Sequence, residues 1–200
     1  MNHNLHNDLT TIILAGGKST RMGTDKALIN IQGVPMLQLI CSIAEVCTHQ
    51  VYVVTPWPER YQQILTPNSQ FILEVPLTGE TENEPRTHGP LVGFMQGLAI
   101  VDTNWVLLLA CDLPNLRPEI LQIWISQLDT IPENAIAALV KNNQIWQPLC
   151  GFYRSRCLPQ LTQYINQGGR SFQQWLKSYH VYELPLTDPE MLFNFNSSHS

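Results

Sequence analysis

The sequence predicts a single-domain α/β protein with a doubly wound, mainly parallel, Rossmann-like sheet that contains one antiparallel strand. Three observations support this prediction. Short apolar runs alternate with amphipathic segments along most of the chain, which is typical of βαβ units with right-handed crossovers. A glycine-rich loop directly follows the first apolar run. The length of 200 residues suits one domain with a substantial core.

The elements of the first half alternate regularly. Leu9–Leu14 and Val51–Val54 are apolar and rich in β-branched residues, which predicts buried strands. Between them, Pro35 can begin a helix to about Cys47, because the apolar residues of that segment recur at spacings of three and four. A short helix around Glu59–Leu65 then leads to a third strand, Phe71–Val75.

The second half continues the pattern from Gly89. We expect helices at Gly89–Val101, Pro118–Leu128, Ser155–Ile165 and Ser171–Leu176. We expect strands at Trp105–Ala110, Ala135–Val140, Gln147–Tyr153 and Tyr179–Leu184, and Gln147–Tyr153 is the candidate antiparallel strand. The remaining segments 1–8 and 197–200 have the character of terminal tails, so the domain is expected to span residues 9–196.

The loop after Leu14 is the strongest functional signal. Its glycines, Gly16 and Gly17, allow backbone N–H groups to approach a phosphate closely. The loop is also basic: the nine positions 18–26 contain Lys18, Arg21 and Lys26, which are three of the chain's eleven lysines and arginines. The chain as a whole carries a formal net charge of −5. The spacing matches neither a Walker A motif nor a dinucleotide fingerprint. Phosphate binding is therefore favoured over a simple basic turn.

Asp112 is the candidate metal ligand. It follows the most apolar predicted strand, Trp105–Ala110, within the run Cys111-Asp112-Leu113-Pro114. Carboxylate oxygens and nucleotide phosphates are the usual ligands of Mg²⁺, so we favour this function over an aspartate that only shapes a turn. The neighbouring Cys111 is expected to pack as a small hydrophobic residue rather than to act as a reactive thiol.

Composition excludes several other classes. The chain has 44% hydrophobic and 14% charged residues, which is typical of a globular protein. It has no apolar run of membrane-spanning length and no signal peptide, so a cytoplasmic protein without membrane association is expected. The five cysteines form no C-x-x-C pair, which favours reduced thiols over disulfides. Cations are too few outside the glycine loop for a nucleic-acid-binding surface.

The run LAGG-x-S-x-R-M-G-x-D-K, residues 14–26, resembles the signature of the MobA-like nucleotidyltransferases, and within them the molybdenum cofactor guanylyltransferases. Three later segments fit the same family in order: Gly89–Gly93, Cys111–Pro114 and Phe193–Asn196. The similarity thus extends from about Thr10 to Asn196.

The resemblance implies a Mg²⁺-dependent enzyme that transfers GMP from GTP to molybdopterin or its molybdenum-loaded form, with release of pyrophosphate. It implies catalytic roles for Arg21, Lys26 and Asp112, with Asp112 as the metal ligand, and it implies transient contact with the proteins that deliver or receive the cofactor. The expected GTP-binding residues are Leu14, Ala15, Gly16, Gly17, Lys26 and Asp112. Asp25 is expected to orient the loop or Lys26, because a free carboxylate would repel phosphate.

The chain departs from the family pattern at three places. Thr20 replaces an arginine that often precedes Arg21, Val75 stands where an aspartate is usual, and Ser197-Ser198 replaces Thr-Pro. Independently of these departures, a related enzyme that uses CTP or a sugar 1-phosphate is the nearest alternative, although related cytidylyltransferases read Leu-Ala-Ala-Gly at residues 14–17. A nucleotide-binding regulatory protein without catalysis is a second alternative.

Three further segments have two interpretations each. Residues 76–88 form either a flap beside the site or a variable surface insertion. Gly93 and Gly97 allow close packing or close approach of a ligand, and packing is favoured. Gly168–Ser171 is either an anion site at a helix start or a pair of helix-capping glycines.

Overall fold

The computed structural model describes residues 8–16, 25–77 and 88–195. Its main sheet has seven strands in the order β5-β4-β1-β6-β8-β7-β9. The strands are β1 (Leu9–Leu14), β4 (Val51–Thr55), β5 (Ser69–Leu73), β6 (Trp105–Ala110), β7 (Ala135–Asn142), β8 (Ile145–Arg154) and β9 (His180–Glu183). The pairs β1–β4, β1–β6, β4–β5 and β7–β9 are parallel. Only β8 runs against its neighbours, β6 and β7, which confirms the predicted mainly parallel sheet and its antiparallel strand.

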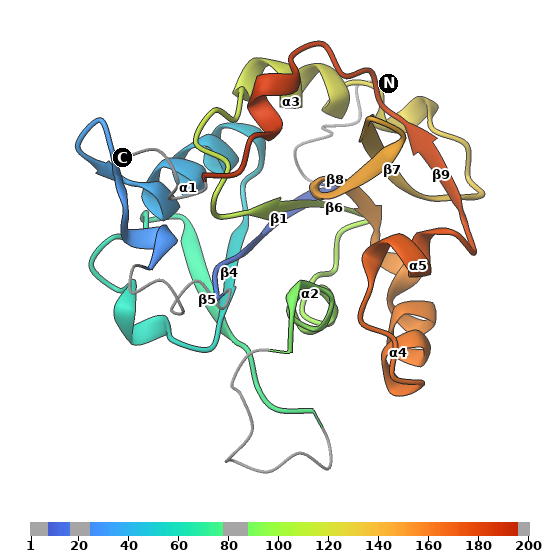
Figure 1. The fold of residues 1–200 in the computed structure, drawn as a ribbon, viewed down its shortest axis with the longest axis horizontal. Coiled ribbons are helices and arrows are strands. Elements are labelled where there is room, and N and C mark those ends of the chain that lie inside the picture. Colours follow the sequence, from blue (N-terminus) through green and yellow to red (C-terminus); the bar gives the residue numbers. More distant parts are fainter. Residues whose placement is uncertain (1–7, 17–24, 78–87, 196–200) are drawn as a thin grey trace.

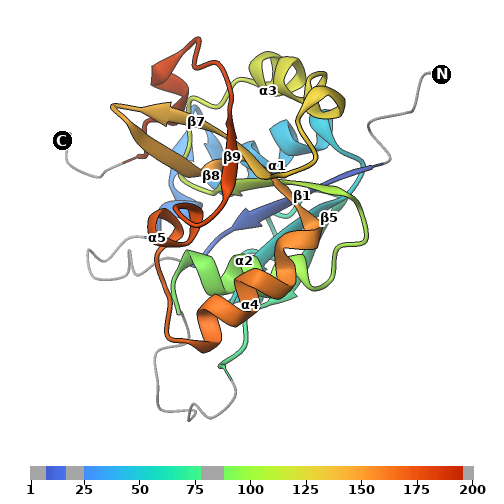
Figure 2. The same cartoon turned by 90° about the vertical axis from the view of Figure 1, so that its right-hand side faces the viewer.

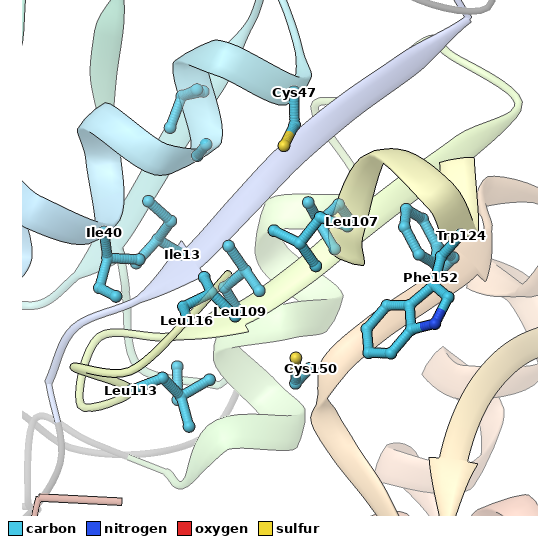
Figure 3. Close-up of a cluster of buried hydrophobic side chains, with 14 of the residues drawn as sticks. Ile13, Ile40, Cys47, Leu107, Leu109, Leu113, Leu116, Trp124, Cys150 and Phe152 are labelled. Atoms are coloured by element: carbon cyan, nitrogen blue, oxygen red, sulfur yellow. The ribbon is translucent and has the colours of Figure 1, made fainter. Parts of the chain in front are cut away.

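Helices cover both faces of this sheet (Figures 1 and 2). One face carries α1 (Met36–Cys47) and α3 (Pro118–Ile125), and the other carries α2 (Pro90–Leu98), α4 (Leu158–Asn166) and α5 (Phe172–Leu176). Alternate residues of the central strands supply the two cores because side chains of a strand point to opposite faces. In Figure 3, Ile13, Leu107 and Leu109 belong to the core beneath α1 and α3.

The opposite core contains the residues between them in sequence. Ile12, Val106 and Leu108 are fully buried beneath α2 and its neighbours. Gly97 of α2 lies so close to this layer that a Cβ atom would meet Val54 Cγ2 at 2.9 Å and Ile12 Cδ1 at 3.0 Å. Close packing therefore accounts for Gly97.

Several predicted boundaries require correction. No α-helix forms at Glu59–Leu65, where the chain makes a 3₁₀ turn, η4 (Pro58–Arg60), followed by further turns. Prolines before and after this segment leave too few residues to form a stable α-helix. The third strand spans Ser69–Leu73, so Glu74 and Val75 lie beyond its end. The helix expected at Ser155–Ile165 begins as a 3₁₀ turn, η6 (Ser155–Cys157), before α4.

Short elements between β1 and α1 were not anticipated. A 3₁₀ turn, η3 (Lys26–Leu28), precedes a two-stranded hairpin, β2 (Asn30–Ile31) and β3 (Val34–Pro35). Two further 3₁₀ turns, η5 (Leu128–Thr130) and η7 (Pro189–Leu192), follow α3 and β9. Asp8, at the end of the expected tail 1–8, accepts hydrogen bonds from the backbone N–H and side-chain amide of Asn104. Within the described residues, no helix has the length and apolar character needed to cross a membrane.

Candidate active site

A cavity of about 630 Å³ opens at the carboxyl ends of the parallel strands. In an open α/β sheet this edge is the usual ligand position. The residues that line it include the end of β1 at Leu14, Ala15 and Gly16, and the residues after β6 at Cys111 and Asp112. Backbone hydrogen bonds tie these ends together, since Ala15 N donates to Val54 O and Cys111 N donates to Leu14 O.

Lys26 and Asp112 meet inside this cavity although 86 positions separate them. The Lys26 ammonium donates to Asp112 Oδ2 at 3.1 Å. Both side chains are partly buried, with 22% and 18% of their surface exposed. The pair places a fixed cation beside a carboxylate that still has access to the cavity. Such an arrangement can bind phosphate oxygens on one side and a divalent cation on the other.

Asp25 holds the segment that carries Lys26. Its Oδ1 accepts a hydrogen bond from Ala27 N at 3.1 Å, so it caps η3. Its Oδ2 accepts a 2.7 Å hydrogen bond from the hydroxyl of Tyr61, which is almost completely buried, and Arg60 lies 3.9 Å away. Burial and the adjacent carboxylate raise the pKa of Tyr61, so its hydroxyl stays protonated as a donor. Asp25 thus orients Lys26, and Tyr61 is the support that sequence reasoning missed.

Glu74 is a second residue of the cavity that the sequence did not single out. It lies just past β5 with only 9% of its surface exposed, and burial raises the pKa of its carboxyl from 4.5 to about 7. Its Oε1 accepts a hydrogen bond from His88 N, while Oε2 faces Gly16 and Gly93. A Cβ atom at Gly93 would lie 3.5 Å from Glu74 Oε2, so this glycine lines the cavity as well as packing.

The neighbouring Val75 has a different role. Its backbone N–H donates to Gln96 Oε1, its carbonyl accepts from Gln96 Nε2, and its side chain is 46% exposed. These two bonds fix the segment after β5 against α2. The carboxylate that faces the cavity is therefore Glu74, one position before the site where the family usually has an aspartate.

The structure brings five of the expected site residues together. Leu14, Ala15, Gly16, Lys26 and Asp112 all line the cavity. Gly17 and Arg21 lie outside the described residues, as does most of the segment expected to act as a flap. Phe195, in the expected C-terminal motif, donates its backbone N–H to Asp112 O at 2.9 Å. The C-terminal segment therefore returns to the candidate metal ligand.

The cysteines are thiols in this structure. Four of the five cysteines are buried and Cys111 is partly buried, and none is in a disulfide. Burial, with nearby carboxylates, raises the pKa of Cys111, which favours the protonated thiol over the nucleophilic thiolate. No cluster of three or more potential metal ligands occurs among the described residues.

The sequence was compared with protein-family models and with known proteins. A model of the MobA-like NTP transferase domain matches residues 11–181. The chain belongs to the MobA-like NTP transferase family. A probable molybdenum cofactor guanylyltransferase of Nostoc sp. is 58% identical over 96% of this chain and 87% of its own length. A second, from Synechococcus elongatus, is 40% identical over 95% of this chain and 94% of its own length.

Solved structures show the same fold. The molybdopterin-guanine dinucleotide biosynthesis protein A from Archaeoglobus fulgidus superposes with a TM-score of 0.74. That comparison covers 94% of this chain and 93% of the other, at 20% identity. The two chains therefore share their fold at low sequence identity.

Proposed function

We propose that this protein transfers GMP from GTP to molybdopterin or its molybdenum-loaded form and releases pyrophosphate. The observation that carries the proposal is the single cavity that contains Leu14–Gly16, the Lys26–Asp112 pair and Glu74. Family membership and the names of the relatives support the nucleotide and the acceptor.

In the proposed reaction, an oxygen of the acceptor's terminal phosphate attacks the α-phosphorus of GTP. A new P–O bond forms as the bond between the α-phosphorus and the oxygen bridging to the β-phosphate breaks, and pyrophosphate leaves with the electron pair. Catalysis of this kind depends mainly on positioning and on offsetting negative charge. Lys26 interacts with the phosphates, and the backbone of Leu14–Gly16 positions the nucleotide.

The donor set near Asp112 fits Mg²⁺. A partly exposed carboxylate inside the cavity supplies one hard oxygen ligand, and nucleotide phosphates and water supply the others in typical Mg²⁺ sites. Asp112 would hold the ion, which when bound offsets the charge on the phosphates. Lys26 keeps the Asp112 carboxylate oriented into the cavity.

Glu74 provides a physical reason for guanine. The Watson–Crick edge of guanine has two adjacent donors, the N1–H and the 2-amino group, and a carboxylate can accept from both. Cytosine lacks this donor pair. A buried acceptor left unpaired by the wrong base costs binding energy, so the site can discriminate strongly.

The test is a panel of GTP, CTP, ATP and UTP with purified protein, molybdopterin and Mg²⁺, with pyrophosphate release as the readout. We expect turnover with GTP and near loss of turnover in Asp112→Asn. The matched control is Asp102→Asn, which removes an exposed carboxylate outside the cavity. Preference for CTP, or full activity of Asp112→Asn at modest Mg²⁺, would contradict the proposal.

A further inference from the structure

The cavity extends along the sheet rather than beneath a single strand. Its lining residues follow β5, β4, β1 and β6 at their carboxyl ends and include Leu149 of β8. Neighbouring strands are ~4.8 Å apart, so five adjacent strands span ~19 Å. Glu74 follows the strand at one end of this row, Asp112 follows the fourth of the five strands, and Leu149 lies in the fifth. The proposed nucleotide contacts extend over the first four strands, from Glu74 to Asp112, which leaves the β8 end of the row.

The basic side chains that line the cavity indicate what its remaining part, at the β8 end, can bind. Among the described lining residues, the lysine and arginine side chains are those of Lys26 and Arg170. Lys26 is already paired with Asp112 at 3.1 Å. The proposed reaction brings two phosphorylated substrates together, and their repulsion must be offset. Arg170 is the second cation available for that purpose within the described cavity.

The turn between α4 and α5 presents Arg170 to the cavity. Its Nη1 donates to Ile165 O and Gly169 O, each at 2.8 Å. Both acceptors are neutral carbonyls, and no ion pair to Arg170 occurs among the described residues, so its charge is not neutralised by them. The guanidinium is held in place, and its other N–H groups donate to none of the residues that the structure describes.

Two glycines make this turn possible. Gly168 has a positive φ of 87°, a conformation that glycine adopts without a Cβ penalty. At Gly169 a Cβ atom would lie 2.4 Å from the ring of Tyr164, closer than any real contact. The rings of Phe94 in α2 and Phe172 in α5 lie 5.9 Å apart, which holds α5 beside the helix that begins at the cavity. Figure 2 shows α2 and α5 on the same face of the sheet.

We propose that Arg170 and Leu149 form the subsite for the acceptor substrate. The guanidinium binds the oxygens of the acceptor's phosphomonoester, for which its planar fork is well matched. Leu149 contacts the uncharged part of the acceptor. This inference rests on the proposed function, and it places the acceptor on the β8 side of Asp112 and the nucleotide base on the β5 side.

The test compares Arg170→Ala and Arg170→Lys with the wild-type full-length protein. At saturating GTP, we expect the KM for molybdopterin to rise ~10- to 100-fold in Arg170→Ala, as for loss of hydrogen bonds to a charged group. The Kd for GTP alone, measured by calorimetry, is expected to stay within twofold. Arg170→Lys should recover part of the loss, because it keeps the charge but not the fork. Arg156→Ala is the matched control, since Arg156 also donates to backbone carbonyls but lies outside the cavity.

A second measurement separates this inference from the proposed function. Phenyl phosphate serves as a simple phosphomonoester probe, titrated into the GTP-bound protein. We expect its binding to weaken several-fold in Arg170→Ala and to be unchanged in Arg156→Ala, even if the wild type releases no pyrophosphate with molybdopterin. Absence of wild-type turnover would contradict the proposed function alone. An unchanged acceptor KM and unchanged phenyl phosphate binding in Arg170→Ala would overturn the subsite, as would a selective loss of GTP affinity.

Discussion

Replacing Glu74 by glutamine should change how the stability of the protein depends on pH. The native state holds the Glu74 proton up to a pKa of about 7, whereas the unfolded chain releases it near 4.5. Between these values the native state binds more protons, so the wild-type free energy of unfolding falls as pH rises. At about 1.4 kcal/mol per pKa unit, the loss at this buried group is about 3 kcal/mol.

Glu74→Gln has no charge to bury, so it should escape this loss. Urea unfolding followed by tryptophan fluorescence at pH 5, 6.5 and 8 measures the effect. The stability of Glu74→Gln relative to wild type should rise by about 2–3 kcal/mol between pH 5 and 8. The control, Glu119→Gln, removes an exposed carboxylate from the first turn of α3 and should leave the wild-type profile unchanged. Parallel profiles for wild type and Glu74→Gln would refute the reasoning.

The same group should couple GTP binding to proton release. Guanine donors require the carboxylate form, whereas burial favours the protonated form in the free protein. GTP binding near pH 6.5 should therefore release a proton, and GTP affinity should increase as pH rises through about 7. Calorimetry in two buffers of different ionisation enthalpy counts the released protons. Glu74→Gln should release none from this position, and equal release by both proteins would refute the contact.

Three other substitutions test the surrounding site. Lys26→Ala should lower kcat/KM by ~10²-fold or more without a large change in melting temperature, because a preorganised donor to the phosphates is lost; a loss below fivefold would contradict its role. Gly16→Ala should lower the GTP:CTP ratio of kcat/KM. It should also destabilise the fold by ~1–3 kcal/mol, because the new Cβ would lie 2.7 Å from Pro56 Cδ. An unchanged ratio would show that base choice is made elsewhere. Tyr61→Phe should reduce kcat/KM more than Tyr153→Phe, which removes an equally buried hydroxyl bonded to Pro148 O; equal effects would mean that the Tyr61 hydroxyl only stabilises the fold.

The sequence predicted the central elements well because their signal is local. The limits of β1 and β6 agree with prediction, since both strands are buried on two faces; β6 is an uninterrupted apolar run, and β1 combines apolar residues with two β-branched threonines. The edge strand β5 was less clear. Its Leu73 is 55% exposed whereas the adjoining Glu74 is buried, which inverts the expected hydropathy pattern. A charged residue buried beside a cavity cannot be recognised from periodicity alone.

The residues of the candidate site were likewise predicted only in part. Motif spacing singled out the loop after β1, Lys26 and Asp112, and the fold places their described residues around one cavity. Tyr61 was not recognised, and Gly168–Ser171 was considered as an anion site without placing its Arg170 in that cavity, because both depend on contacts across the fold. Tyr61 reaches Asp25 over 36 positions, and Arg170 depends on a turn built by two glycines. Neither contact leaves a periodic signal.

The pairing of β1 with β6 determines when the nascent chain can form the centre of its sheet. Leu9–Leu14 aligns with residues 105–110, almost one hundred positions later in the chain. During synthesis, the segment that we propose binds the nucleotide emerges long before its central partner strand. Such long-range closure is intrinsically slow, and ribosomes add only ~5–20 residues per second. We therefore expect a nascent chain that ends before Trp105 to be unable to bind GTP, since Asp112 has not yet been made and β1 lacks one neighbour.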